Sequence, residues 1–252
     1  GESTITDPDL LALIACPTLQ RLRGINQAGP SALAFPFKAV TRFEHSLGVF
    51  LLLRRLGADR REQVAGLLHD VSHTAFSHAV DFLYASDEQN HHELIKHRFL
   101  HRPDLASALD RLGYRPEEFL DDAIYPLLER PLPWLCADRL DYFFRDSLAC
   151  GVTTAPVVTR LLEALDVDDQ TIVFTSPSAA REAASLFAAM NREWWASPTE
   201  AYIYNEFAIA LRTAFDAGLL VEDDLMEDDA HVLARLHVSA DPRVSDALHR
   251  IE

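Results

Sequence analysis

The sequence predicts an all-α fold: a helical bundle with at most a short β-hairpin. Apolar residues recur at helical spacing along most of the 252 residues. Hydrophobic residues make up 48% and charged residues 25% of the chain, as in ordinary globular proteins. We therefore expect a single domain over residues 1–252, with a core at about 19–150 and a C-terminal helical part at about 151–252.

Start and stop signals divide this pattern into elements. Gly57 follows the first long helical stretch, and Pro116 with two glutamates is typical of a helix start. An acidic turn and a β-branched run at 166–175 predict the hairpin, near 170–174. The acidic cluster that begins at Glu222 is interpreted as solvated surface. Helices are expected at 42–56, 61–71, 77–85, 91–100, 103–112, 116–128, 133–150, 154–165, 178–195, 199–217 and 228–236.

Charge and cysteine content limit the partners. The net charge is −16, from 39 acidic and 23 basic residues, which disfavours duplex nucleic acid but leaves a small phosphorylated ligand open. The chain shows neither a run of about 18 apolar residues nor a basic, apolar leader, so we expect no membrane partner and no export. Three cysteines at no ligand-like spacing indicate a reduced, cytoplasmic protein. A homo-oligomer stays open.

Four residues in order, His45, His69, Asp70 and Asp138, form a candidate metal site. Two imidazoles and two carboxylates suit one divalent ion, Mn, Fe, Co, Ni or Mg, rather than a thiolate-bound zinc. Each residue alone is more often a capping or core residue, but bundles commonly build metal sites from facing helices. The pair His69 and His73 also has the spacing of a zinc metalloprotease helix, although that pattern needs Glu where Asp70 stands.

A second set of residues could act on a bound anion. His73 is expected one helical turn beyond His69, and His78 and His92 follow; imidazoles that titrate near neutrality can neutralise charge or protonate a leaving oxygen. Arg42, one turn before His45, could bind a phosphate with two N–H groups. The alternative for each histidine is a structural or surface role.

The predicted helix after residue 133 carries a polar stripe. Asp138, Tyr142 and Asp146 are spaced by four residues, so they share one face that could hold a sugar hydroxyl. A buried network that only fixes helix packing is the alternative. Trp194, Trp195, Tyr202 and Tyr204 are aromatic residues that more often belong to a core.

These strings resemble the HD-domain phosphohydrolase superfamily, and within it the deoxynucleoside triphosphate triphosphohydrolases. The resemblance is carried by residues 19–23, 26–27, 35–36, 42–48, 68–78, 92–93 and 138–146. It departs from the family at Ala28, at Cys136 and around Trp194 and Pro198, where the family has other residue types.

The resemblance implies a role for each matching residue. It implies metal ligation by His45, His69, Asp70 and Asp138. It implies phosphate contacts for Arg42 and Arg139, and leaving-group assistance from His73, His78 and His92. It implies that Gln27, Tyr142 and Asp146 hold the sugar and that Tyr202 packs beside the nucleoside.

We therefore predict a metal-dependent phosphohydrolase that acts on a nucleotide or nucleotide-like phosphate, with one divalent ion as its cofactor. The base and the number of phosphates removed stay open. One alternative is an HD-type di-iron oxygenase, for which His92 is a candidate extra ligand. The other is a non-catalytic, nucleotide-binding regulator, against which the complete ligand set argues.

Overall fold

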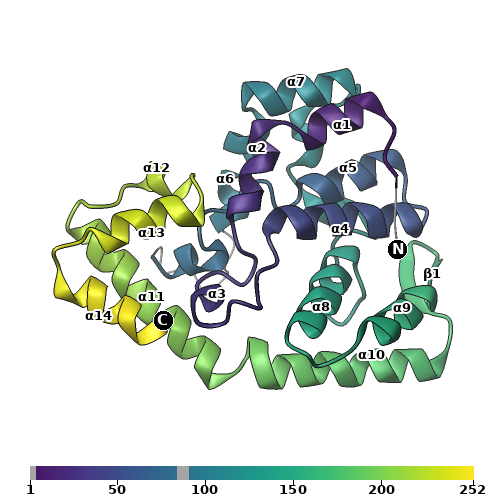
Figure 1. Ribbon diagram of the computed structural model, residues 1–252. Coiled ribbons are helices and arrows are strands. Elements are labelled where there is room, and N and C mark those ends of the chain that lie inside the picture. The colour runs from purple at the N-terminus through teal and green to yellow at the C-terminus, as the bar shows by residue number, and fades with distance from the viewer. Residues whose placement is uncertain (1–3, 84–90) are drawn as a thin grey trace. The chain divides into compact units, whose positions relative to one another are not determined.

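A computed structural model describes residues 4–83 and 91–252 (Figure 1). Its chain forms two compact units, each built from separate stretches. The first unit comprises Gly1–Glu44, Asp70–Leu120 and Pro198–Glu252, and the second comprises His45–His69 and Asp121–Ser197. That both units belong to a single domain stays a prediction.

The all-α prediction is confirmed, since the β structure of the described residues consists of one hairpin and an isolated bridge. The first part of the chain forms α1 Pro8–Ile14, α2 Pro17–Gln20, α3 Ser31–Ala34, α4 Arg42–Arg55, α5 Arg60–Leu68, α6 His91–Leu100 and α7 Pro103–Arg111. The middle part forms α8 Ala137–Ala149, α9 Ala155–Glu163, β1 Leu165–Asp168, β2 Thr171–Phe174 and α10 Pro177–Met190. The last part forms α11 Pro198–Asp216, α12 Glu222–Leu225, α13 Asp229–His237 and α14 Pro242–Ile251. Short 3-10 turns lie at Arg21–Gly24, Ser77–Leu83, Pro116–Phe119 and Asp122–Ile124, and a π-helical turn at Asn191–Trp195.

The C-terminal helices give the first unit its apolar core. Helix α11 packs along α14 and α13 (Figure 1), and the turn at Ser77–Leu83 packs against α11. Phe76 and Phe207 meet at the centre with ring centroids 4.3 Å apart, and both side chains are buried. This packing connects the chain just after Asp70 to helices more than 100 residues later.

In the second unit, α4 and α5 are joined by a short turn, and α8 lies beside α10 (Figure 1). Gly57 adopts a positive φ of 77° at the turn, and Asp59 caps α5 by accepting from Glu62 N at 2.9 Å. Strands β1 and β2 pair antiparallel from Leu165↔Phe174 to Asp168↔Thr171.

Several predicted helices are placed differently by the structure. The helix expected at 116–128 is wrong: two 3-10 turns replace it, because Pro126 cannot donate within a helix. The stretch expected at 61–71 stops being helical at Leu68. The hairpin is confirmed, and α6 has the predicted bounds. Part of the helix expected at 77–85, residues 84 and 85, lies outside the described residues.

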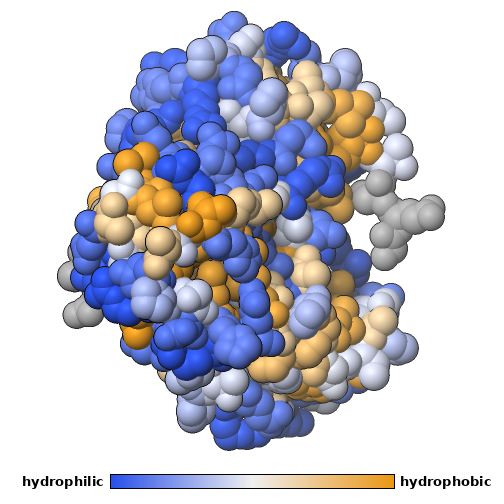
Figure 2. Space-filling model, turned by 60° about the vertical axis from the view of Figure 1, so that its left-hand side comes forward, coloured by the Kyte–Doolittle hydropathy of each residue, from blue (hydrophilic) through white to orange (hydrophobic). Residues whose placement is uncertain are grey.

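The acidic cluster after Glu222 is only partly solvated surface. Glu222 and Asp223 are exposed, whereas Asp224 is buried and accepts from Val221 N at 2.9 Å. Asp229 accepts from two backbone amides. The surface face shown in Figure 2 is largely hydrophilic with separate apolar patches. Within 4–83 and 91–252, no helix combines the length and the apolar character that a membrane crossing requires.

Glu62 of α5 binds the loop around Leu127 and Leu128 within the second unit. Its Oε1 accepts from Leu127 N at 2.6 Å and from Leu128 N at 3.2 Å, so it satisfies two buried amides of the loop that replaces the predicted helix. Glu62→Ala leaves both amides without this acceptor and should lower the free energy of unfolding by about 2–4 kcal/mol. Glu163→Ala, at an exposed position of α9, is the matched control and should change it by less than about 0.5 kcal/mol. Chemical denaturation measures both, and equal effects would contradict the anchoring role.

Candidate metal centre and anion site

Three donor atoms converge in the second unit. His45 Nε2 of α4 lies 2.9 Å from Asp138 Oδ1 of α8 and 3.2 Å from His69 Nε2. His69 Nε2 is in turn 3.5 Å from the same carboxylate oxygen. Residues that stand 93 positions apart in the chain therefore present one oxygen and two nitrogens to a common point.

The other nitrogen of each ring has its own partner. His45 Nδ1 lies 2.9 Å from Asp141 Oδ2, and His69 Nδ1 lies 2.9 Å from the carbonyl oxygen of Gly66. Both partners accept, so both Nδ1 atoms carry hydrogen, and in a neutral ring Nε2 then carries a lone pair. Two lone pairs and a carboxylate oxygen cannot face one another at these distances without a proton or a metal cation between them.

Asp141 and Arg145 orient His45 from behind. Arg145 Nε donates to Asp141 Oδ2 at 2.6 Å, one helical turn along α8. Gly48 allows this arrangement, since a Cβ atom there would collide with Asp141 Oδ1 and Arg145 Nη2. A histidine that binds a metal commonly donates its second N–H to a carboxylate in this way.

Charges around Asp138 favour its ionised form. Burial raises its pKa, but His45 and His69, when Nε2 of each ring is protonated, bind Asp138 by hydrogen bonds that outweigh burial and hold the pKa well below the ordinary value. A metal cation bound at this point would take the place of those protons. Nearby Glu129 shows the opposite shift, because burial and then the charge of Asp138 raise its pKa to about 7. One carboxylate of the pair is therefore kept as an anion for a cation to bind.

A second cluster lies in the first unit, around Asp70. Arg42 Nη1 donates to Asp70 Oδ2 at 2.7 Å, and Arg42 Nε donates to Ser77 Oγ at 3.0 Å. The side chains of Arg42 and Asp70 are both buried. Asp70 Oδ1 also lies 3.2 Å from His73 Nε2.

Three histidines group beside this ion pair. His73 and His92 stack with centroids 4.1 Å apart at 15°, and His78 meets both edge-on, at 4.8 and 5.3 Å. His73 is not on a helix: α5 ends at Leu68, and the predicted turn-to-turn relation of His69 and His73 is wrong. His73 reaches Asp70 through the loop at 71–77 instead.

Burial keeps two members of this cluster, His73 and His92, neutral. Burial, and then the Arg42 charge, hold the pKa of His73 well below its usual value. Burial lowers the pKa of His92 to about 3, against the attraction of Asp70. Among the described atoms, His92 Nδ1 is buried and has no hydrogen-bond partner. The guanidinium of Arg42 and the N–H group of neutral His92 are donors that suit phosphate oxygens.

His78 is fixed by a residue that the sequence interpretation missed. Its Nδ1 lies 3.1 Å from Asp81 Oδ2, and Asp81 Oδ1 accepts from His91 N at 3.0 Å. Burial raises the pKa of Asp81, but the His78 and His91 hydrogen bonds bring it below the ordinary value. The carboxylate thus leaves Nε2 of His78 as the ring atom for a ligand.

The residues assigned to the sugar lie on α8 near Trp195. Asp146 Oδ2 accepts from Trp195 Nε1 at 2.9 Å, and the rings of Tyr142 and Trp195 meet edge-on at 5.4 Å. Burial and the charge of Asp138 raise the pKa of Tyr142, so its hydroxyl keeps its proton. The polar stripe therefore exists on one helix, and its sugar contact stays a prediction.

The other assigned substrate residues are placed as follows. Arg139 Nη1 donates to the carbonyl oxygen of Trp134 at 2.6 Å and Nη2 to that of Arg130 at 3.0 Å, so its guanidinium holds a loop. Gln27 Oε1 is buried without a hydrogen-bond partner among the described residues. Tyr202 is 46% exposed on α11. Their contacts with substrate stay predictions.

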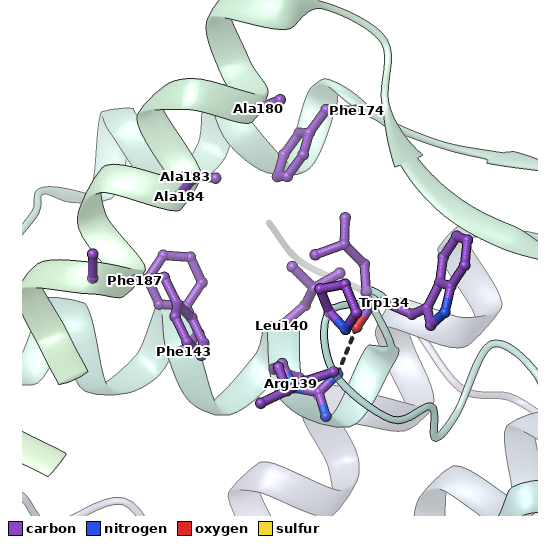
Figure 3. Close-up of a pocket in the computed structure, with 13 residues that line it drawn as sticks. Trp134, Arg139, Leu140, Phe143, Phe174, Ala180, Ala183, Ala184 and Phe187 are labelled. Carbon is purple, nitrogen blue, oxygen red and sulfur yellow. Dashed lines mark hydrogen bonds between the residues drawn. The ribbon is translucent and has the colours of Figure 1, made fainter. Parts of the chain in front are cut away.

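The second unit also contains an apolar cavity of about 400 Å³. Phe143 of α8 and Phe187 of α10 meet on one side, and Phe174 lies near Ala180 on another (Figure 3). The lining includes Arg139, whose bond to Trp134 is the dashed line in Figure 3. Asp138 and Asp141 are not part of this lining, so the cavity adds no group to the donor cluster.

The sequence interpretation missed Asp141 and Ser77 as well as Asp81. Asp141 could have been found, because it is three residues after Asp138 and therefore on the same helical face. Ser77 carried no such signal, since a loop brings it to Arg42.

The donor set fits a divalent metal. Two imidazoles with their lone pairs directed inward and one ionised carboxylate converge in the second unit, and Asp70 follows His69 directly in the chain. Nitrogen and oxygen donors of this mixture suit a first-row divalent ion.

Comparison with known proteins agrees with this chemistry. The model of a family described as HD domain matches residues 42–133. An uncharacterised Bacillus subtilis protein, YdhJ, is 38% identical over 246 residues, covering 97% of this chain and 76% of its own length. The metal-dependent phosphohydrolase cns2 of Cordyceps militaris is 32% identical over 267 residues, covering 100% of this chain and 75% of its own length.

Two further matches are more distant. A deoxynucleoside triphosphate triphosphohydrolase SAMHD1 homolog of Dictyostelium discoideum is 32% identical over 203 residues, covering 67% of this chain and 39% of its own length. A crystal structure of a phosphohydrolase from Bacteroides thetaiotaomicron has a TM-score of 0.71 at 23% identity, covering 99% of this chain and 77% of that chain. The structural match supports the fold.

The carboxylate of Asp141, which accepts from His45 Nδ1, gives a prediction about metal affinity. Asp141→Asn replaces an acceptor of the His45 N–H by a weaker one, so the affinity for Mn²⁺ or Co²⁺ should fall about 10–100-fold. Asp166→Asn, at an exposed position of β1, is the charge-matched control and should leave it unchanged. Isothermal titration with the metal alone measures both variants. An Asp141→Asn protein with wild-type affinity would show that Asp141 does not orient a ligand.

Proposed function

Because the chain belongs to the HD-domain family of metal-dependent phosphohydrolases, we propose that it hydrolyses a nucleotide or nucleotide-like phosphate at a centre with one divalent ion. The proposed ligands are His45, His69, Asp70 and Asp138. The convergence of His45, His69 and Asp138 on one point carries this proposal. Asp70 is included as the fourth ligand because it directly follows His69 in the chain.

The ion, when bound, supplies Lewis-acid stabilisation of charge that develops on phosphoryl oxygen. Arg42 and the histidines bind the remaining oxygens. The buried guanidinium of Arg42 is held by Asp70 and Ser77, so it meets a phosphate without having to be ordered first. Neutral His92 can donate its one N–H group to a phosphate oxygen, whereas the one N–H group of neutral His73 is directed at Asp70 Oδ1.

Proton transfer to the leaving oxygen is assigned to the histidine cluster. Burial and Arg42 keep His73 neutral, and a bound phosphate adds negative charge that raises the pKa of a neighbouring imidazole. The bound phosphate thereby favours the protonated imidazole that can act as the general acid. His78, whose Nδ1–H is bound by Asp81, would carry the transferred proton on Nε2 in its protonated form and become neutral as the leaving oxygen takes that proton.

The nucleotide part of the substrate is supported by the Dictyostelium discoideum relative, which is named for deoxynucleoside triphosphates. Tyr142 and Asp146 would hold the sugar, with Gln27 and Tyr202 as further contacts. The orphaned oxygen of Gln27 is a buried acceptor that a sugar hydroxyl would satisfy. We propose a cytoplasmic enzyme from its three free cysteines, with a small molecule rather than duplex nucleic acid as its partner.

A two-metal centre is the second candidate, because Asp70, His73 and His92 offer three ligand atoms within 4.8 Å of one another. The Arg42 guanidinium disfavours a second ion, because its fixed positive charge lies 2.7 Å from Asp70 Oδ2 and repels another cation there. We therefore propose a centre with one ion and a hydrolase rather than an oxygenase. Elemental analysis with phosphate release measured against oxygen uptake separates the two: two irons per chain with oxygen uptake would favour the oxygenase.

The reaction is tested by a product-resolved screen of nucleoside mono-, di- and triphosphates with Mn, Co, Fe and Mg each supplied. We expect phosphate or polyphosphate release that stops with a chelator and returns with added metal. Asp70→Ala should lose both metal and turnover, because a ligand and the Arg42 partner disappear together. The exposed Asp110→Ala is the matched control. Full turnover in chelator would overturn the proposal.

The sugar assignment has its own test. Asp146→Asn keeps the size of the side chain but removes its charge, so discrimination in favour of a 3′-hydroxyl should weaken. The loss of a charged hydrogen bond costs about 1.5–3 kcal/mol, or roughly one to two decades in kcat/KM. Metal content should stay at the wild-type value. Wild-type ratios for substrates with and without the 3′-hydroxyl would remove Asp146 from the sugar site.

A further inference from the structure

The loop at 71–77, which follows Asp70 and contains His73, is held from behind by the segment at 225–229. Ala75 N donates to the carbonyl oxygen of Leu225 at 2.9 Å. Phe76 N donates to Asp229 Oδ1 at 2.6 Å. Arg21 connects the same two stretches, since it donates to the carbonyl oxygens of His73 at 2.7 Å and Glu227 at 3.0 Å.

The loop needs this support because its backbone is strained. Phe76 and Ser77 both have a positive φ, 60° and 54°, which non-glycine residues rarely adopt. Such conformations persist only where the surroundings fix them. The ring of Phe76 packs on Phe207, and its amide is bound by Asp229.

The strained turn determines where Ser77 points. Ser77 Oγ donates to the carbonyl oxygen of Asn26 at 2.7 Å and accepts from Arg42 Nε at 3.0 Å. Asp229 binds the backbone on both sides of the hydrogen bond between Ser77 and Asn26. Its Oδ1 accepts from Phe76 N, and its Oδ2 accepts from Asn26 N at 2.8 Å. The same carboxylate thus fixes the amides of Phe76 and Asn26, and Ser77 lies between them and the guanidinium.

We propose that Asp229 is a positioning residue for the anion site: it holds the left-handed turn at 76–77 and thereby aims Arg42, through Ser77, at the phosphate. The role as a phosphate site rests on the proposed function, whereas the support of the turn does not. Asp229 lies at the start of α13, far along the chain from the residues that it positions.

A carboxylate suits this position better than an amide. The two backbone N–H groups bind different oxygens of Asp229, so Asn would offer one oxygen and turn an NH₂ group toward the other amide. The arrangement is retained although burial raises the pKa of Asp229 to about 7, against the effect of the two amides. The neighbouring Asp228 plays a different part, since it caps α13 by accepting from His231 N at 2.9 Å.

The test compares Asp229→Asn with Asp228→Asn, which makes the same charge change one residue away and keeps a good helix cap. Amide hydrogen exchange is measured on peptides that cover 25–28 and 74–78. Asp229→Asn should speed exchange there by about tenfold, and Asp228→Asn should not. Unchanged exchange in Asp229→Asn would overturn the proposed support.

The second readout is the affinity of the Mn²⁺-loaded protein for inorganic phosphate. Asp229→Asn should weaken it by about tenfold, while bound metal stays constant. Ser77→Ala interrupts the connection without touching Asp229 and should weaken it similarly, so it decides the matter if Asp229→Asn fails to fold. Faster exchange with wild-type phosphate affinity would overturn the positioning role. A wild-type protein that binds no phosphate would overturn the proposed function instead, and the exchange data would still decide the support of the turn.

Discussion

The two Nδ1–H donations, from His45 to Asp141 and from His69 to Gly66, are the interactions on which the metal centre depends. They fix the tautomer of each ring, so both Nε2 lone pairs face the oxygen of Asp138. Such a cluster is unfavourable without a cation, and binding of a cation is therefore favourable. Gly48 and Arg145 matter for the same reason, since they let Asp141 reach His45.

The end of α5 at Leu68 gives consecutive residues two different roles. His69 bonds back to the last turn of its own helix and joins the donor cluster of the second unit. Asp70, already beyond the helix, pairs with Arg42 and His73 in the first unit. If the helix continued as the sequence predicted, the loop at 71–77 could not bring His73 and Ser77 to Asp70 and Arg42.

The local charge around Arg42, rather than the net charge, is the basis of the proposed small phosphate ligand. The chain carries −16 overall, yet Arg42 is buried beside three grouped histidines, two of which have pKa values lowered by burial. A compact anion gains several N–H donors there. An extended polyanion would be repelled by the net charge of −16. This contrast favours a small phosphate over a nucleic acid.

The sequence by itself determined the helical class and the hairpin, because helical periodicity and turn signals are local properties. It also named candidate metal donors by their ligand type, and their binding of a metal stays a proposal. His45, His69 and Asp138 indeed converge. Only the tertiary structure decided the roles of Ser77, Asp81 and Asp229, and it replaced the helix expected at 116–128 with a loop bound by Glu62. These outcomes depend on hydrogen bonds between residues distant in the chain and on strained backbone, which no periodicity encodes.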